Sequence, residues 1–303
     1  MSKLRGSAKQ IIKIEKMGIF SILVFFSLST VLFSGFLEPV EIQFPTCPYF
    51  IKDIKISGNL AFMVTYNHGL RVIDVSNLKE PMEIGHYNNR FSSSRFSGFE
   101  NVSVSGNYAY LAQNTEGLKV LDISEPSKPR LINTYQSPRW ITSVSAVGSL
   151  ACITVHWEGM RVLDVSNPDS IREIGKLRLN DLGDDVQIHG QYAYVHEAYE
   201  HFVIDISQPN SPKQVGHFWD ECFMEDIVIK GDYVFAADGG DGLTIFDITN
   251  LDSIINVANY DFDPEKDPKG RAVAVRLFGN CAYLLSENGD IYKADISSYR
   301  KTR

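Results

Sequence analysis

The sequence predicts an all-β fold, a six-bladed β-propeller of four-stranded antiparallel blades, preceded by one apolar N-terminal helix. The first observation is a short strand pattern that returns six times and always carries Asp at the same place. The six Asp residues are separated by 48, 42, 41, 42 and 48 positions, at Asp74, Asp122, Asp164, Asp205, Asp247 and Asp295. A period in the low forties with strand-like content is typical of a propeller blade.

The second observation is that each period divides into four strands. The first copy, 53–87, has turn signals at Ser-Gly-Asn, at Asn-His-Gly and at Asn-Leu-Lys-Glu-Pro, and the second copy divides at the same places. In the third strand of the first copy, Val72 alternates with Ile73 and Val75, so both faces are apolar. A strand that is buried on both faces is expected where blades stack face to face.

The repeated Asp stands at the end of this apolar strand and is followed by a Ser-Asn type of turn. An Asp carboxylate in that position accepts hydrogen bonds from the backbone N–H groups two residues on, as in an Asx-turn. We therefore expect a structural role for the six Asp residues rather than a catalytic one.

The third observation concerns the ends of the chain. The last copy of the repeat stops after three strands, at 291–298, whereas the segment LEPVEIQF, 37–44, resembles the fourth strand of the first copy, KEPMEIGH. The sequence predicts that this N-terminal segment completes the last blade. Closing the ring in this way removes exposed sheet edges.

The N-terminus has the pattern of an export or membrane segment. Residues 1–16 carry a net charge of +4 and are followed by 21 residues without charge, 17–37, which is about the length of a transmembrane helix. We expect a basic cytoplasmic segment at 1–16, a signal sequence or retained anchor at 17–37, the propeller at 38–298 and a C-terminal tail at 299–303. Cleavage or retention of the segment stays open, while export is predicted in both cases.

Charge and cysteine content exclude several classes of protein. Beyond the basic segment the chain has a net charge of −12, which is unsuited to nucleic acid because phosphates are bound mainly by Lys and Arg. The four cysteines, Cys47, Cys152, Cys222 and Cys281, form no C-x-x-C motif. Export permits disulfides, but the spacing indicates no pairing.

Two repeated segments resemble a known family. GLRVIDVSN, 69–77, and VSGNYAYL, 104–111, are similar to the LVIVD-type repeat of bacterial and archaeal surface propellers, and the likeness extends over most of 38–298. The resemblance implies a cell-surface or secreted binding module. It transfers no catalytic residue.

Exposed aromatic residues are the first candidate site. Function gathers where a scaffold holds variable loops, and the loops between second and third strands and between blades vary most. These loops contain Trp140, Trp157, Tyr199 and Trp219. Flat rings supply large contact areas, so they predict a surface for a protein or a glycan. The alternative is that the rings fill gaps between blades.

Polar residues at the entry to the innermost strands are the second candidate. Equivalent positions around the predicted channel hold Asp53, Asn101, Ser143, Asp185, Asp226 and Ala272. Converging carboxylates could bind calcium, or each side chain could cap a loop backbone. A hydrolase or lyase, with Asp185 or Asp226 as general base or metal ligand, is the alternative to a binding module.

Overall fold

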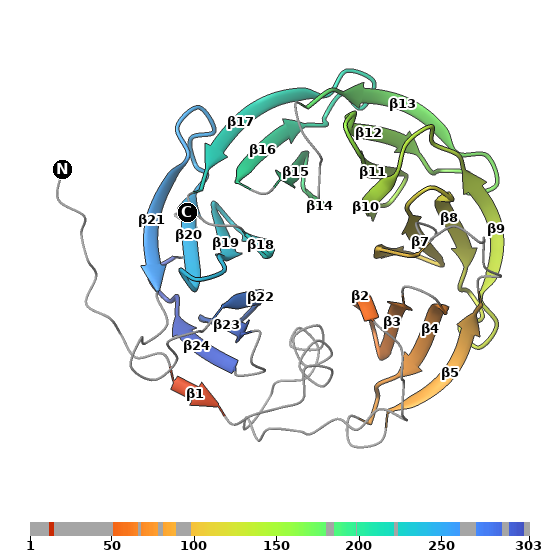
Figure 1. The fold of residues 1–303 in the computed structure, drawn as a ribbon, viewed down its shortest axis with the longest axis horizontal. Coiled ribbons are helices and arrows are strands. Elements are labelled where there is room, and N and C mark those ends of the chain that lie inside the picture. Colours follow the sequence, from red (N-terminus) through yellow and green to blue (C-terminus); the bar gives the residue numbers. More distant parts are fainter. Residues whose placement is uncertain are drawn as a thin grey trace. The chain divides into compact units, whose positions relative to one another are not determined.

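The computed structural model describes ten segments of the chain. They comprise residues 12–14, 51–65, 68–77, 81–88, 98–179, 185–197, 199–220, 224–260, 271–286 and 291–299. All secondary-structure elements in these segments are strands, and they form six four-stranded antiparallel sheets (Figure 1). The prediction of an all-β, six-bladed propeller with four-stranded blades is thus confirmed.

Blades 1 to 5 each use four consecutive strands. Blade 1 holds β2 (Ile51–Ser57), β3 (Leu60–Thr65), β4 (Gly69–Asp74) and β5 (Met82–Tyr87), and blade 2 holds β6 (Asn101–Ser105), β7 (Tyr108–Gln113), β8 (Gly117–Asp122) and β9 (Arg130–Tyr135). Blade 3 holds β10 (Ile141–Val147), β11 (Leu150–Val155), β12 (Gly159–Asp164) and β13 (Arg172–Leu177). Blade 4 holds β14 (Asp185–His189), β15 (Tyr192–Glu197), β16 (Glu200–Asp205) and β17 (Lys213–Trp219), and blade 5 holds β18 (Asp226–Lys230), β19 (Tyr233–Ala237), β20 (Leu243–Asp247) and β21 (Ile255–Tyr260).

Blade 6 takes its fourth strand from the other end of the chain. It consists of β22 (Ala272–Phe278), β23 (Cys281–Ser286), β24 (Ile291–Asp295) and β1 (Ile12–Ile14), and β1 pairs antiparallel with β24 from Ile12 opposite Lys293 to Ile14 opposite Ile291. The sequence pattern predicts 37–44 at this edge, and that segment lies outside the described residues. Both segments alternate apolar and other residues, and a sheet edge offers the same backbone groups to either.

The chain divides into two compact units. The first unit is Ile42–Glu197 with His201–Val215, and it holds blades 1 to 3 and most of blade 4. The second unit is Met1–Glu41, Ala198–Glu200 and Gly216–Arg303, and it holds blades 5 and 6. The end of β17 belongs to the second unit.

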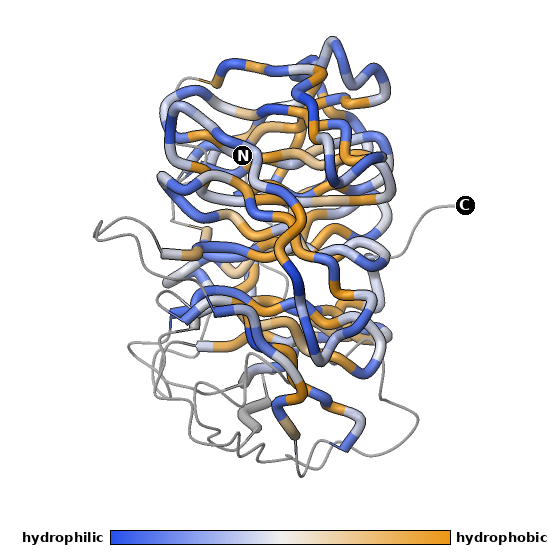
Figure 2. The backbone as a smooth tube through the Cα atoms, turned by 90° about the vertical axis from the view of Figure 1, so that its right-hand side faces the viewer, coloured by the Kyte–Doolittle hydropathy of each residue, from blue (hydrophilic) through white to orange (hydrophobic). Residues whose placement is uncertain are grey.

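Hydrophobic cores lie between neighbouring blades. In the first unit, Val72 and Leu121 share one buried cluster, and Val120 and Leu163 share the next. In the second unit, Ile245 of blade 5 packs in one cluster with residues of blade 6. Figure 2 shows hydrophobic residues along the strands and hydrophilic ones at the turns. In blade 1 the third strand is buried on both faces, as the sequence predicts, and so is the second strand.

Glycine lets the outer strand of a blade approach the turn of the next. A Cβ at Gly85 of β5 would stand 2.2 Å from the carbonyl oxygen of Pro126, and one at Gly175 of β13 would stand 2.0 Å from that of Pro209. No side chain fits at such distances, so these two outer strands require glycine where the following blade packs against them.

The prediction of an Asx-turn at the repeated Asp is confirmed in all six blades. The Oδ1 atom of each Asp accepts a hydrogen bond from the backbone N–H two residues later, over 2.8–3.0 Å, at Ser76, Ser124, Ser166, Ser207, Thr249 and Ser297. In blade 2 the Ser124 hydroxyl, its backbone N–H and Arg130 hold the pKa of Asp122 down at about 2. All six carboxylates therefore have the structural role that the sequence predicts, because each accepts a backbone hydrogen bond within its own turn.

Several sequence predictions fall outside the described residues. They are the membrane segment 17–37, the strand 37–44, residues 300–303, and the cysteines Cys47 and Cys222. Within the described segments, no helix long and apolar enough to cross a membrane occurs. Cys152 and Cys281 are free thiols; Cys152 is buried, and burial raises its pKa to about 12.

Candidate functional site

The polar residues at the entry to the innermost strands link neighbouring blades within each unit, blades 1 to 4 in the first and blades 5 and 6 in the second. In the first unit, Asp53 of β2 accepts hydrogen bonds from the Asn101 side chain and from the backbone N–H of Val102, both at 3.0 Å. Burial raises the pKa of the Asp53 carboxyl, while Lys55 and the backbone N–H groups lower it. The contact from Asp53 joins blade 1 to blade 2.

The same arrangement continues along the unit. The Asn101 Oδ1 atom accepts the N–H of Val144 at 3.0 Å, so blade 2 is joined to blade 3. The Ser143 hydroxyl donates to Asp185 and accepts the N–H of Val186 at 3.4 Å, which joins blade 3 to blade 4.

In the second unit, Asp226 of blade 5 accepts the N–H of Val275 at 3.0 Å and also a hydrogen bond from Arg276. Of the two interpretations offered by the sequence, these contacts support side chains that cap backbone groups. The residue of blade 6 that corresponds to Asp226 is Ala274, not Ala272 as the sequence alignment predicts. Blades 1 and 3 have the same register shift directly before Asp53 and Ser143, and in blade 6 the residue after this shift is Ala274.

Serine residues extend this ladder and were missed in the sequence. The hydroxyl oxygens of Ser103, Ser105 and Ser145 accept backbone N–H groups of the next blade at 3.0–3.1 Å, from Ala146, Gly148 and Ile188 respectively. Their signal is a polar residue at every second position of an innermost strand, as in NVSVS. In the described segments, no group of three or more His, Cys, Asp and Glu is arranged to hold a metal ion.

The predicted aromatic residues form two groups, one in each unit. In the first unit, Trp157 is 60% exposed and Trp140 is half-buried. His156 lies between them, with ring centroids 5.1 Å from Trp140 and 4.7 Å from Trp157, both edge to face. The Arg139 guanidinium stands 5.8 Å from the Trp157 ring centroid. These four residues are named the Trp157 group.

In the second unit, Tyr199 and Trp219 stack on one another. Tyr199 lies just before β16, whereas Trp219 is the last residue of β17 and does not lie in a loop as the sequence predicts. Their ring centroids are 5.9 Å apart with planes at 24°, and they are 45% and 57% exposed. His217 and Glu200 form an ion pair at 3.9 Å when the histidine is protonated. Tyr199 and Trp219 are named the Trp219 group.

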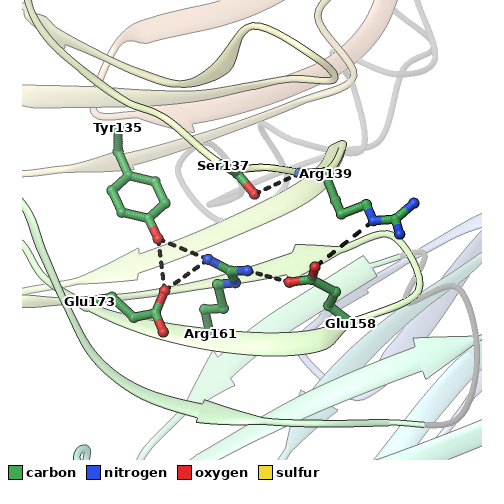
Figure 3. Close-up of polar contacts among 6 residues, drawn as sticks. All are labelled: Tyr135, Ser137, Arg139, Glu158, Arg161 and Glu173. Carbon is green, nitrogen blue, oxygen red and sulfur yellow. Dashed lines mark hydrogen bonds and ion pairs between the residues drawn. The ribbon is translucent and has the colours of Figure 1, made fainter.

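A charge network includes Arg139 of the Trp157 group and Glu158, the residue after Trp157 (Figure 3). Arg161 of β12 has a side chain that is only 13% exposed, and it donates to Glu158, to Glu173 at 2.8 Å and to the Tyr135 hydroxyl at 3.2 Å. Tyr135 in turn donates to Glu173 at 2.9 Å. Arg139 lies 3.9 Å from Glu158 on the solvent side. The network fixes the turn that carries Trp157.

A buried carboxyl pair lies in the second unit. Asp238 is 1% exposed and Asp220 is 8% exposed. Asp238 accepts a hydrogen bond from the Thr244 hydroxyl at 2.7 Å. Burial first, and then the charge of Asp220 and the hydrogen bond with it, raise the pKa of Asp238 to about 7. A carboxyl group with this pKa is half-protonated near neutral pH.

Comparison with known proteins identifies the class to which the chain belongs. A family model described as LVIVD repeat matches five segments, 51–89, 99–137, 139–178, 183–220 and 224–262. The matches cover more than half of the chain, so the chain belongs to the LVIVD repeat family, and the resemblance seen in the sequence is confirmed. A comparison with curated proteins finds no match.

Solved structures are similar in fold. The computationally designed Ika8 protein has a TM-score of 0.61 at 10% identity, over 81% of this chain and 71% of that one. A chain of the Mitotic Checkpoint Complex has a TM-score of 0.65 at 9% identity, over 83% and 76%. At these identities the likeness shows the fold alone.

Proposed function

We propose that this protein is an exported, membrane-tethered propeller that binds a protein or a glycan through the aromatic side chains of its variable loops. The observation that carries the proposal is the Trp219 group. Two large rings stack on each other and remain about half exposed, whereas isolated apolar side chains on a surface are common and need no explanation. Trp and Tyr are enriched at the centres of binding surfaces.

Binding is tested by exchange of the stacked rings. The full chain, solubilised in detergent and immobilised, is exposed to protein and polysaccharide fractions of an envelope extract from the producing cells. We expect a component that is retained by the wild type and lost on Trp219→Ser. Ile255→Ser, which changes a 54% exposed side chain on β21, is the matched control and should retain it. Equal retention of every component by wild type and Trp219→Ser would refute the proposal.

The supporting observation for export is the charge-free segment 17–37 behind a basic N-terminus. In this proposal the membrane segment separates Ile12–Ile14 from blade 6, and the segment 37–44 takes the place of β1 beside β24. An alkaline phosphatase fusion after residue 303 should be active, because this enzyme folds only outside the cytoplasm. Deletion of 17–37 should abolish the activity while the fusion protein is still made. A fusion that is equally active with and without the segment would contradict export.

A further inference from the structure

Trp157 has a positive φ angle, a backbone conformation that is unfavourable for a bulky side chain. It lies in a tight turn closed by a hydrogen bond from the Glu158 N–H to the Val155 carbonyl, 2.9 Å long, and its φ angle is +61°. Glycine and asparagine are the usual residues at such an angle, and a bulky side chain there is strained. Burial does not compensate for this strain, because the indole is 60% exposed. Strained exposed residues of this kind cluster at functional sites.

The indole is surrounded by polar groups that are held in place. Arg139 lies over the ring, His156 lies at its edge, and Glu158 follows it in the chain. Glu158 forms an ion pair with the mostly buried Arg161, and Arg139 lies 3.9 Å from its other carboxylate oxygen. A ligand on the ring therefore meets the exposed Arg139 guanidinium and the Glu158 carboxylate, which Arg161 holds in place.

In the described part of the chain, Trp157 is the one exposed large apolar side chain at this place, and Trp140 beside His156 is half-buried. Among the described residues of the first unit, the exposed large hydrophobic side chains are Met82, Leu131, Val147 and Trp157. Val147 pairs with Leu150, whereas Val155, beside the turn, pairs with Ile141, so Val147 lies at the opposite end of blade 3. Met82 pairs with Asp74, also at the end of its sheet away from the equivalent turn.

This composition separates two classes of ligand. A stable protein interface covers about 800 Å² on each partner and has an apolar centre, which one indole does not supply. A pyranose ring has one flat face of C–H groups that matches a single indole, and its hydroxyls pair with planar guanidinium and carboxylate groups. We infer that the Trp157 group binds one sugar ring of a polysaccharide, stacked on Trp157 and hydrogen-bonded by Arg139 and Glu158. This inference rests on the proposed binding function and names its ligand class.

The test uses the full chain in detergent with purified polysaccharides as probes. Chitin, cellulose and peptidoglycan sacculi are tested by co-sedimentation, and alginate, pectin, mannan and dextran by affinity electrophoresis. We expect retention by at least one probe and a loss of affinity of about tenfold or more on Trp157→Asn. Asparagine accepts the positive φ angle, so the unfolding midpoint of this variant should be unchanged or higher. Val147→Asn, at the other end of the blade, is the matched control and should bind as the wild type does.

Three outcomes overturn the inference. One is that no polysaccharide of the panel binds, and another is that Trp157→Asn binds as tightly as the wild type. The third is a Trp157→Asn variant whose unfolding midpoint falls by several degrees, because the ring would then serve packing. If a protein from the envelope extract binds through Trp219 while no polysaccharide binds, the proposed function stands and the inference about Trp157 fails.

Discussion

Blades 3 and 5 place charge differently at the turn between their second and third strands. In blade 3 the third residue of the third strand, β12, is Arg161, which forms ion pairs with Glu158 and Glu173. In blade 5 the equivalent residue is Thr244, and its hydroxyl is a neutral donor to Asp238. The pKa of Asp238 rises to about 7, chiefly through burial. At equivalent turns, blade 3 therefore has ionised carboxylates paired with a cation, whereas blade 5 has a carboxyl pair that retains a proton.

The difference shows what a buried carboxyl requires. An Arg satisfies two carboxylates at once because its planar fork has five donors. Without a cation, two neighbouring carboxyls avoid repulsion by sharing a proton, which makes their contribution to stability dependent on pH. Four substitutions test this comparison.

The largest expected effect is that of Asp238→Asn at alkaline pH. The pKa of Asp238 is higher in the folded protein, about 7, than its ordinary 3.8, so the folded state binds the extra proton. The stability that this proton provides is full below about pH 4 and is lost as pH rises to about 7. Asn mimics the protonated acid. The unfolding free energy of the variant should therefore exceed that of the wild type by about 2–3 kcal/mol more at pH 8 than at pH 5.

Urea unfolding of both proteins at pH 5 and pH 8 measures this difference. Asp252→Asn changes an exposed carboxylate on the turn before β21 and serves as the control, which should follow the wild type at both pH values. An Asp238→Asn protein whose stability changes with pH as the wild type does would show that the pair carries no shared proton.

The second effect is that of Arg161→Met in blade 3. Met keeps much of the buried aliphatic volume but leaves Glu173 without its cation and Glu158 with Arg139 alone, 3.9 Å away. We expect a loss of about 2 kcal/mol at pH 7. The double variant Arg161→Met/Glu173→Gln should recover part of the loss, because the uncompensated charge of Glu173 is gone. If the single variant unfolds at the same urea concentration as the wild type, the network contributes nothing to stability.

The sequence predicted the parts of this fold that depend on local order. The six Asx-turns are predicted by the residues next to Asp74 and its equivalents, and the number of blades is predicted by the six copies of the repeated strand. The column through Asp53 and Asn101 was also identifiable, but its role depends on backbone N–H groups supplied by the next blade. Two hydrogen-bonding groups from different blades are brought together only by packing, which the sequence of one blade does not specify.

In the candidate sites, too, some features are predicted by the local sequence and others depend on the folded structure. The exposed indoles were named from the loops that carry them, whereas the positive φ angle of Trp157 has no sequence signal, since Gly or Asn is the usual residue there. Asp220 and Asp238 lie in different strand connections, and no motif in the sequence marks either of them. The sequence also does not show the ion pair of Arg161 with Glu173, because Arg161 lies opposite Lys176 and Glu173 lies opposite Leu163, on the two sides of a register shift.

The third effect is that of Thr244→Val in blade 5. Val keeps the shape of Thr and removes the hydroxyl that donates to Asp238, which costs about 1 kcal/mol. The Thr244 hydrogen bond lowers the pKa of Asp238, so its loss should raise that pKa above its wild-type value. The fall of stability with pH should then extend to higher pH. A carboxyl resonance of Asp238 followed by NMR gives the shift directly, and an unchanged titration would contradict it.

The smallest effect is expected at Lys119 of blade 2, at the position equivalent to Arg161. Lys119 is 9% exposed, burial lowers its pKa, and the charge of Glu116 only partly offsets this. Its outer strand offers Leu131 where blade 3 offers Glu173. Lys119→Met therefore removes a desolvated charge with little compensation, and the unfolding free energy should change by less than about 0.5 kcal/mol or rise. A loss as large as that of Arg161→Met would mean that the cation itself stabilises these turns, whatever the outer strand offers.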